Sequence, residues 1–566
     1  MPVMDFNKRY LEKLIDAKFD SIEFEDILWK MGFTVEGSTE DTISVEITPN
    51  RPDMLDAVGF ARAFRHFTGK SKEYDYEIKD QKLDVSITVG SNAKKVRPFI
   101  ASFTVHNINF TEDSLTNLLN ATDKFTDTFG RKRKKIAIGI HNLDTVSGNI
   151  EYDAYHDSKY VPLNMNKEMK YSEVLSTSEK GMKYKEALKR GTKLYPALHD
   201  HKGTLALIPI LNSERTKVTT STKNLLVDIT GSSEYLVNKT AELLACSFID
   251  MGATVRKAGI KYPEKVAETP LMDKQTISLT IKRIIGELGV KMSSDSILAM
   301  GHRMGYSCTL DGKKITFTVP QYRVDIINEQ DVIEDLLIAF GYDNIVPAAV
   351  PSINPGASEE LTRKRTSIED LMIGSGYNQM FNSYLSNDTY NFSMMRQNAP
   401  TDSAVRIKNP KTDAATVMRT WLTPSLLRNV SLSLNERMPL NVFELDMAFS
   451  VKAGMPSEKY HIAAVSCSSK ANFNDAKGLA ELILSNLGLE YTISDSKNEC
   501  FIEGRRAGIF HNGKEIGFFG EIHPEVLSNF KIEEPAIGVE ITLPFESYSY
   551  IGNSKTADQN VKKTVK

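Results

Sequence analysis

Short runs of β-branched and apolar residues recur between residues 86 and 262, and this pattern predicts strands. The runs read LDVSITV, KIAIGI, LALIPIL and NLLVDIT. The last run is followed by a helical pattern from Ser233 to Met251, whereas residues 1–85 are mostly helical in pattern, with a strand at 42–47. Strands and helices in these proportions predict a multidomain α+β chain.

Changes in pattern divide the chain into four segments and a tail. We expect an N-terminal helix and strand domain at 1–85, an α/β domain at 86–262, a smaller domain at 268–346 and a mixed domain at 356–548. A Pro-rich linker, VPAAVPSINPG, precedes the fourth domain. Residues 549–566 form a polar, Lys-rich tail whose composition is typical of disorder.

The first and third segments resemble each other. ILWKMGFTVE at 27–36 is similar to ILAMGHRMGYSCT at 297–309, and each is followed by a strand, a proline and an R-x-D triplet. The triplets end at Asp53 and at Asp325, at nearly the same distance from the preceding Met-Gly pair. A duplicated small helical unit of winged type is the simplest account.

The stretch RVDIINEQDVIEDLL in the second copy concentrates carboxylates on one predicted helix. We expect that helix to begin after Asn328 as its N-cap and to end at Gly341. At about 100° per residue, an apolar stripe separates from an acidic face. The stripe comprises Ile333, Leu336, Leu337 and Phe340, and the acidic face comprises Asp331, Glu334 and Asp335, with Asp325 just before the helix.

Two interpretations of these carboxylates remain open. Acidic residues stabilise a helix N-terminus, and a charged face is commonly just solvated. The other interpretation is a metal site, because the first copy has Gly59, Arg62 and Ala63 at the corresponding positions, so the scaffold does not require carboxylates there. Oxygen ligands without His or Cys suit a hard cation, Mg²⁺ before Ca²⁺.

Composition limits the partners and the compartment. The net charge of the 566 residues is only −3, so a nucleic acid would have to meet a local basic surface, such as GRKRKK at 130–135. A solvated loop is at least as good an interpretation of that run. The four cysteines are far apart, and no apolar stretch approaches the roughly 20 residues of a membrane span. We expect a cytoplasmic protein without membrane contact.

Several motifs together resemble one family. YRVDIINEQDVIEDLLIAFGYDNI is similar to the signature of the phenylalanyl-tRNA synthetase β subunit, and ITPNRPDMLDAVGFARAF to the N-terminal signature of its archaeal and eukaryotic form. KIAIGIHNLDTV, PILNSERTKVTTSTKNLLVDITG, MRTWLTPSLLRNV and GEIHPEVL extend the resemblance over nearly the whole chain. In that family, the carboxylates matching Asp325, Asp331, Glu334 and Asp335 are assigned to Mg²⁺ near the α subunit.

The resemblance implies an aminoacyl-tRNA synthetase subunit. Residues 356–548 would form a class II synthetase-like antiparallel domain without adenylation activity, because the final strand, AIGVEITL at 536–543, has no arginine for ATP. ATP-dependent adenylation would occur on an α subunit, in an (αβ)₂ heterotetramer that binds tRNA(Phe). MRTWLTPSLLRN is better interpreted as core and interface than as active site.

The segment 86–262 resembles the family's editing domain, which hydrolyses Tyr-tRNA(Phe). The candidate pocket residues are Asn212, Ser213, Asp228 and Thr230. Without the family, Asp228 and Thr230 would be interpreted as an ordinary strand end. Ala206 is found where relatives have a pocket serine, which leaves editing less secure than family membership. The alternatives are therefore a β subunit with a non-functional editing pocket and a freestanding tRNA-binding or trans-editing protein.

Overall fold

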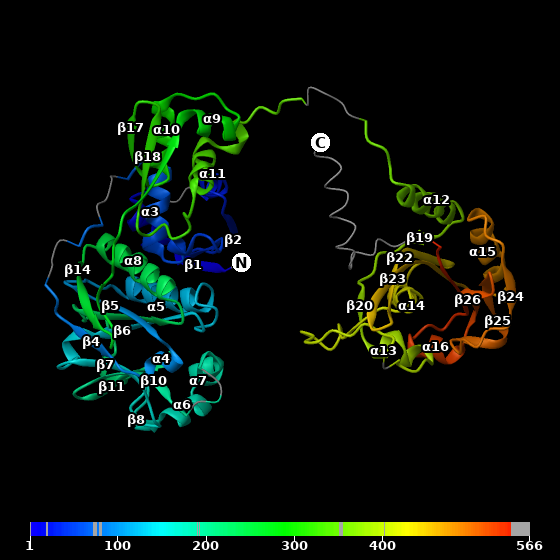
Figure 1. Ribbon diagram of the computed structural model, residues 1–566, viewed down its shortest axis with the longest axis horizontal. Helices are drawn as coiled ribbons and strands as arrows, with labels where there is room; N and C mark the ends of the chain where they lie inside the picture. The colour runs from blue at the N-terminus through cyan, green and yellow to red at the C-terminus, as the bar shows by residue number, and fades with distance from the viewer. Residues whose placement is uncertain are drawn as a thin grey trace, which may run out of the picture. The chain divides into compact units, whose positions relative to one another are not determined.

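The computed structural model describes residues 2–18, 21–71, 76–78, 82–188, 191, 193–349, 355–400 and 402–544. It separates into two compact units, Met1–Ala349 and Val350–Lys566 (Figure 1). The fold is α+β with several sheets, as predicted. The division into four segments stays a prediction. The expected linker lies partly, and the expected tail at 549–566 wholly, outside the described residues.

Two three-stranded sheets in the first unit have the same element order: strand, helix, helix, strand, strand, helix. The first copy comprises β1 (Val3–Asn7), α1 (Lys8–Ile15), α2 (Ser21–Lys30), β2 (Thr34–Ser38), β3 (Thr42–Glu46) and α3 (Ala57–Phe67). The second comprises β16 (Gln275–Thr280), α9 (Ile281–Leu288), α10 (Ser294–Arg303), β17 (Ser307–Asp311), β18 (Lys314–Val319) and α11 (Glu329–Phe340). The repeated unit is thus longer than the sequence similarity indicated.

The R-x-D triplets form the same bidentate ion pair in both copies. Arg51 Nε and Nη2 donate to the two Asp53 oxygens at 2.9 and 2.8 Å, and Arg323 donates to Asp325 at the same two distances. All four residues are largely buried. Burial alone would raise the pKa of Asp325. The two pairs lie close enough that Arg51 helps to lower it. Charges inside a protein need such partners.

Asp335 has a different position from the one predicted. It is only 5 % exposed, so of the two open interpretations a solvated acidic face does not hold for this residue. Its Oδ2 lies 2.8 Å from Arg323 Nη2 and accepts the Tyr306 hydroxyl at 2.5 Å. Burial raises the pKa of Asp335. The helix itself is as predicted, from the Asn328 N-cap to Gly341.

A ten-stranded, mainly antiparallel sheet forms the remainder of the first unit. Its strands in order are β12 (Leu211–Asn212), β11 (Gly203–Leu207), β10 (Tyr195–Asp200), β7 (Ile150–Tyr155), β4 (Ser86–Val89), β14 (Thr254–Lys261), β5 (Phe99–His106), β13 (Leu225–Gly231) and β6 (Ile136–Asn142), with β15 (Val266–Thr269) beside β14. Helix α8 (Glu234–Asp250) packs on β5, β13 and β14, and α5 (Glu112–Asp127) lies beside β6 (Figure 1).

The two ends of this sheet meet. Asn212 Nδ2 on β12 donates to the carbonyl oxygen of Ile140 on β6 at 3.1 Å. Of the smaller elements in this part of the chain, α7 (Glu179–Tyr184) and the 3₁₀ turn η4 (Glu214–Thr216) contribute residues at the junction. The others are α4 (Ala93–Val96), β8 (Lys159–Tyr160), β9 (Met169–Lys170) and α6 (Tyr171–Thr177). Residues far apart along the chain are therefore neighbours at this seam.

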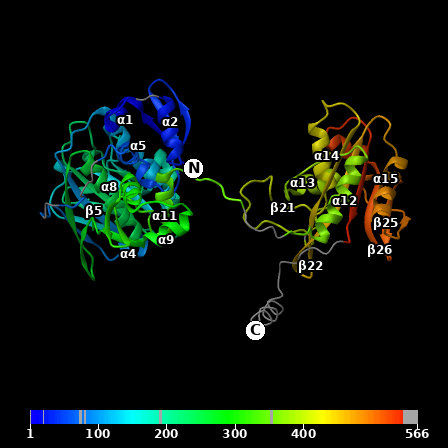
Figure 2. The ribbon, with the colours of Figure 1, turned by 90° about the horizontal axis from the view of Figure 1, so that it is seen from above.

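The second unit is a seven-stranded sheet with a hydrophobic core on each face. Its strands in order are β19 (Asn378–Gln379), β22 (Leu440–Lys452), β23 (Met455–Cys467), β27 (Ala536–Thr542), β26 (Lys514–Ile522), β25 (Phe501–His511) and β24 (Thr492–Ser494). Helices α12 (Glu360–Gly374) and α15 (Phe473–Asn486) cover one face (Figure 2). The other face carries α14 (Thr423–Leu432) and α16 (Pro524–Asn529), near the short α13 (Asp388–Asn391), β20 (Leu385–Ser386) and β21 (Val417–Met418).

Alternate residues of the central strands contribute side chains to the two hydrophobic cores. Ile462 and Ala464 on β23 face α12 and α15, whereas Ala463 and Val465 face α14. This period of two is what a sheet buried on both faces requires. Among the described helices, none combines the length and the apolar character needed to cross a bilayer.

The neighbours Glu334 and Asp335 give a test of what the acidic residues of α11 do. Because Asp335 is buried against Arg323 and Glu334 is exposed, Asp335→Asn should lower the opening free energy of α11 by about 3 kcal/mol, and Glu334→Gln by less than about 0.5 kcal/mol. Hydrogen exchange of the α11 amides, followed by mass spectrometry, measures both. Equal effects of the two substitutions would contradict a dominant role for the Arg323 contact.

Candidate functional site

A cavity of about 310 Å³ lies at the seam of the ten-stranded sheet. Its walls come from both ends of the sheet, with α5 and α7 at its edge. Of the predicted pocket residues, Asn212, Asp228 and Thr230 line it, and so does Ala206. A volume near 300 Å³ is at the lower end of the range of small-molecule sites. The structure thus gathers three of the four candidates around one cavity.

Asp228 and Thr230 occupy alternate positions on β13 and so point to the same face of the sheet. Both are buried. Asp228 is registered opposite Gly139 on β6, and Thr230 opposite Ala137. A Cβ on Gly139 would lie 2.0 Å from Asp228 Oδ2, so only glycine leaves room for this carboxylate. The small residues of β6 therefore make space for the polar residues of β13.

Arg97 fixes Thr230 from behind. Its Nε donates to Thr230 Oγ1 at 3.0 Å, and its Nη2 donates to the Thr230 carbonyl at 2.7 Å. Because a guanidinium only donates, Thr230 Oγ1 is the acceptor and its own O–H remains available for a bound molecule. Burial lowers the pKa of Arg97 to about 10, which still leaves it charged at neutral pH.

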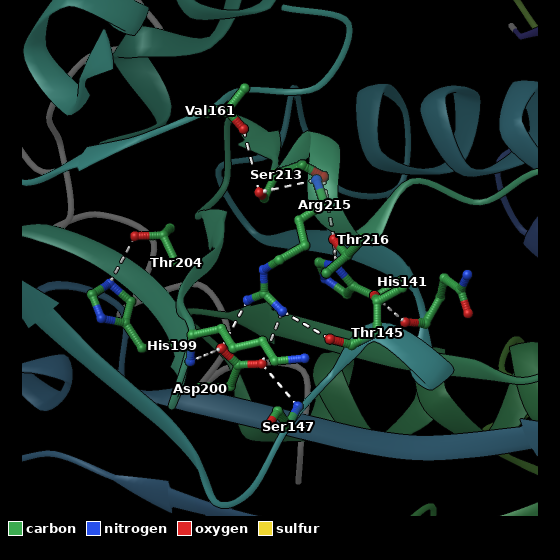
Figure 3. A network of polar contacts seen from close by, with 12 residues as sticks. His141, Thr145, Ser147, Val161, His199, Asp200, Thr204, Ser213, Arg215 and Thr216 are labelled. Carbon is green, nitrogen blue, oxygen red and sulfur yellow. Dashed lines mark hydrogen bonds and ion pairs between the residues drawn. The ribbon is translucent and has the colours of Figure 1, made fainter. Parts of the chain in front are cut away.

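Asp228 is held through one of its oxygens. His141 Nε2 lies 3.0 Å from Asp228 Oδ2, and the other ring nitrogen, Nδ1, lies 2.8 Å from Thr216 Oγ1 (Figure 3 shows His141 beside Thr216). Within the described part of the chain, Asp228 Oδ1 has no hydrogen-bond partner. Oδ1 is therefore the acceptor that Asp228 offers to a molecule in the cavity.

The basic run at 130–135 contains a residue that builds the cavity. Arg131, Lys132 and Arg133 all have positive φ, and this turn buries Arg133 while its basic neighbours stay exposed. The Arg133 guanidinium donates to the carbonyls of Pro209 and Ile210 at 3.0 and 2.9 Å and to Asp123 at 2.7 Å. For Arg133, neither a solvated loop nor a phosphate contact is the right interpretation.

Ser213 is the candidate that the structure does not bring to the cavity. Its hydroxyl donates to the Val161 carbonyl at 3.3 Å and accepts from the Arg215 amide, so it caps η4 (Figure 3). Arg215 in turn binds Asp200 at 2.8 Å and the Thr145 carbonyl at 2.9 Å. These contacts anchor η4, and with it Thr216.

Sequence reasoning missed Arg97, Arg133, His141 and Thr216. For His141 there was a usable signal: a histidine two positions after Gly139 on an apolar strand has to find a polar partner when buried. For Arg97, Arg133 and Thr216 there was none, because their partners are far away along the chain.

The four predicted metal ligands do not form one site. Asp325 and Asp335 bind Arg323, and Asp331 Oδ2 accepts the amides of Ile327 and Asn328 at 2.7 and 2.8 Å as part of the helix cap. Glu334 is exposed. In the described ranges, no three His, Cys, Asp or Glu side chains are grouped so that they could hold a metal ion. A guanidinium already occupies the position between two of the carboxylates, so this set does not fit Mg²⁺.

The polar interior of the second unit is also internally paired. Glu540 on the final strand β27 accepts from the Leu422 and Thr423 amides at 3.0 Å, from the Thr423 hydroxyl at 2.6 Å and from His461 Nδ1 at 2.7 Å. Burial by itself would raise the pKa of Glu540. These donors together lower the pKa by more than burial raises it, so the pKa lies below its ordinary value. The final strand thus carries a fully bonded carboxylate.

Much of the run MRTWLTPSLLRN lies in the core, as predicted, and its role in an interface stays a prediction. Leu422, Leu426 and Leu427 are buried against the sheet, and Arg419 is bound to Glu444 at 2.6 Å. Arg419 is only 1 % exposed. This arginine is therefore engaged within the unit.

Comparison with known proteins agrees with this architecture. The model of the phenylalanyl tRNA synthetase beta chain CLM domain matches residues 346–543, and the model of the tRNA synthetase B5 domain matches residues 277–342. A crystal structure of an N-terminal fragment of the phenylalanyl-tRNA synthetase β subunit from Pyrococcus horikoshii is similar over 60% of this chain and 100% of that chain, with a TM-score of 0.58 and 30% identity.

Two relatives matched over nearly their whole length carry the same name. The phenylalanine–tRNA ligase β subunit of Archaeoglobus fulgidus is 34% identical over 547 residues, covering 96% of this chain and 98% of the relative. That of Methanocaldococcus jannaschii is 32% identical over 563 residues, covering 96% of this chain and 100% of the relative. The chain therefore belongs to the family of phenylalanine–tRNA ligase β subunits, which are subunits of an aminoacyl-tRNA synthetase.

Proposed function

We propose that this chain assembles with an α subunit into a cytoplasmic (αβ)₂ ligase that charges tRNA(Phe) with phenylalanine, and that its cavity hydrolyses Tyr-tRNA(Phe). The observation that carries the editing part is the pair Asp228 and Thr230, buried side by side with one free acceptor and one free donor at the cavity. Adenylation is assigned to the α subunit.

The chemical need for such a cavity follows from the two amino acids. Tyrosine differs from phenylalanine by one hydroxyl, and an apolar synthetic pocket discriminates weakly against an added hydroxyl. A second site that hydrogen-bonds the hydroxyl can discriminate by about 10⁴-fold or more, because buried polar groups stay unpaired when phenylalanine enters. Correctly charged Phe-tRNA(Phe) would therefore be spared.

The reaction is the hydrolysis of an ester. Water attacks the carbonyl carbon of the tyrosyl ester, the bond to the terminal ribose oxygen breaks, and tyrosine and tRNA(Phe) are released. Asp228 Oδ1 can accept a proton of the water or of the tyrosyl ammonium group, and the Thr230 hydroxyl can donate to an oxygen of the substrate. Asn212 lines the same cavity, and no protein nucleophile is required.

The assignment of adenylation to the α subunit is supported by the second unit. Class II adenylation needs fixed cations at the phosphates. Here the final strand presents Glu540, whose oxygens are bonded to His461, Thr423 and backbone amides, and Arg419 is paired with Glu444. A freestanding trans-editing protein is the weaker alternative, because relatives matched over 98–100% of their length are named as subunits.

Magnesium has no part in the proposed editing reaction. Asp325 and Asp335 are both ion-paired with Arg323, and the two remaining carboxylates, Asp331 and Glu334, lie in the second repeat and not in the cavity. No step of the hydrolysis passes through a metal ion.

Editing is tested by deacylation of Tyr-tRNA(Phe) by the assembled ligase, with Phe-tRNA(Phe) as the control substrate. Asp228→Asn should slow tyrosyl hydrolysis by about 100-fold or more, because a carboxylate acceptor is replaced by an amide of the same shape. Normal formation of Phe-tRNA(Phe) shows that the variant is folded and assembled. If the unaltered ligase does not hydrolyse Tyr-tRNA(Phe), the cavity has only a structural role. The alanine at position 206 in the cavity wall would agree with that result.

Thr230 offers a matched pair of substitutions. Thr230→Val removes the hydroxyl, which both accepts from Arg97 and donates to substrate, and should lower tyrosyl hydrolysis by about 100-fold. Thr230→Ser retains the hydroxyl and should keep the rate within about fivefold of the unaltered ligase. Single-turnover deacylation measures both. If serine and valine have the same effect, the hydroxyl has no role in the reaction.

Removal of divalent cations tests the assignment of the acidic helix. Because Arg323 is the counter-ion of Asp325 and Asp335, EDTA should change the opening free energy of α11 by less than about 0.5 kcal/mol. Hydrogen exchange of α11 in the assembled ligase, with EDTA and with Mg²⁺, gives this value. A fall in protection with EDTA that Mg²⁺ reverses would establish a metal site there.

A further inference from the structure

His141 is a buried side chain whose two ring nitrogens both have partners. It lies on β6 with no exposed surface, Nε2 at 3.0 Å from Asp228 Oδ2 and Nδ1 at 2.8 Å from Thr216 Oγ1. It does not line the cavity, although Asp228 and Thr216 do. Its position is behind the carboxylate, away from any molecule that the cavity would hold.

Thr216 is itself rigidly placed. It lies in η4, which Ser213 caps and which Arg215 anchors to Asp200 and to the Thr145 carbonyl (Figure 3). The Thr216 hydroxyl has two neighbouring acceptors, His141 Nδ1 and, at 3.3 Å, the Ser213 carbonyl. The imidazole ring is therefore held at both ends and cannot turn away from Asp228.

This arrangement is satisfied with either proton content of the ring. In the neutral form, Nε2–H donates to Asp228 and Nδ1 accepts the Thr216 hydroxyl proton. In the charged form both nitrogens donate, and the Thr216 hydroxyl turns its proton to the Ser213 carbonyl. In both forms Nε2 donates to Oδ2, so Oδ1 always remains the free oxygen.

We propose that His141 is a positioning residue of the editing cavity: with Thr216 behind it, it fixes the orientation of Asp228 so that Oδ1 alone is presented to the tyrosyl ester or its attacking water. This inference rests on the function proposed above. Within the described part of the chain, His141 is the hydrogen-bond donor to Asp228 Oδ2, so without this contact the carboxylate can rotate about its side-chain bonds. Small misplacements of a reacting group are costly, reaching about 100-fold for about 1 Å.

The test compares His141→Leu with His141→Gln in the assembled ligase. Leucine removes both hydrogen bonds, and kcat for Tyr-tRNA(Phe) deacylation should fall by about 100-fold while KM stays within about twofold, because His141 does not touch the substrate. Glutamine retains an N–H that can reach Asp228 and should recover at least about tenfold of that loss. A change that only loosened the fold would raise KM as well and would not be rescued by glutamine.

A second substitution keeps the test decisive if His141→Leu does not assemble. Thr216→Val removes the contact on Nδ1 together with the hydroxyl's contact to the Ser213 carbonyl, and it should lower kcat by about tenfold. Little further loss is expected in the double variant with His141→Gln, because the two side chains act as one unit. The control is His199→Leu. His199 lies on β10 and contacts Tyr171 and Thr204, so this substitution should leave deacylation unchanged.

The outcomes separate this inference from the function beneath it. If the unaltered ligase does not hydrolyse Tyr-tRNA(Phe), the editing function is wrong, and the inference with it. If the unaltered ligase hydrolyses the ester and Asp228→Asn abolishes this, while His141→Leu and Thr216→Val retain the full kcat, only the inference about His141 is overturned.

Discussion

The hydrogen bonds of the Arg97 guanidinium hold together the site around which the first unit is built. One side chain binds the hydroxyl and the carbonyl of Thr230 on β13 and, through Nη1, the carbonyl of Arg133 at 3.1 Å in the turn before β6. Arg133 then reaches the carbonyls of Pro209 and Ile210 on the opposite wall. Two arginines therefore connect both ends of a ten-stranded sheet, and the cavity lies between them.

Burial explains why these two arginines make several hydrogen bonds each, although Arg133 Nε has no partner within the described part of the chain. A guanidinium removed from water has to recover its hydration through hydrogen bonds, and backbone carbonyls at a sheet seam provide acceptors that strand pairing has left free. The same need for a partner after burial explains the position of two carboxylates at α11. Asp325 and Asp335 are stabilised by Arg323, so carboxylates that look like metal ligands in sequence act as counter-ions of an arginine in the fold.

In the second unit, the buried charge is a carboxylate, and hydrogen-bond donors stabilise it. Glu540 is buried on the central strand β27 and is stabilised by His461, Thr423 and two backbone amides. An interior arranged around a bonded carboxylate differs from one that holds free arginines for phosphates. The two units of this β subunit thus differ in what they can offer a ligand: the first has a cavity with an unused donor and acceptor, and the second has paired charges at its centre.

Local pattern was sufficient for much of the structure and part of the site. The run NLLVDIT predicted the strand that carries Asp228 and Thr230, and the Asn328 cap and Gly341 stop bounded α11. Strand patterns and helix caps depend on residues that are close in sequence. The family motifs identified the same two residues. The sequence could not decide which side chains contact each other. Asp335 is buried against Arg323, and Ser213 caps η4. The residues that the sequence did not indicate for the site are Arg97, Arg133, His141 and Thr216. Each of those outcomes, except the Ser213 cap, depends on which distant segment supplies a counter-charge or a free carbonyl after burial, and only the tertiary structure brings those segments together.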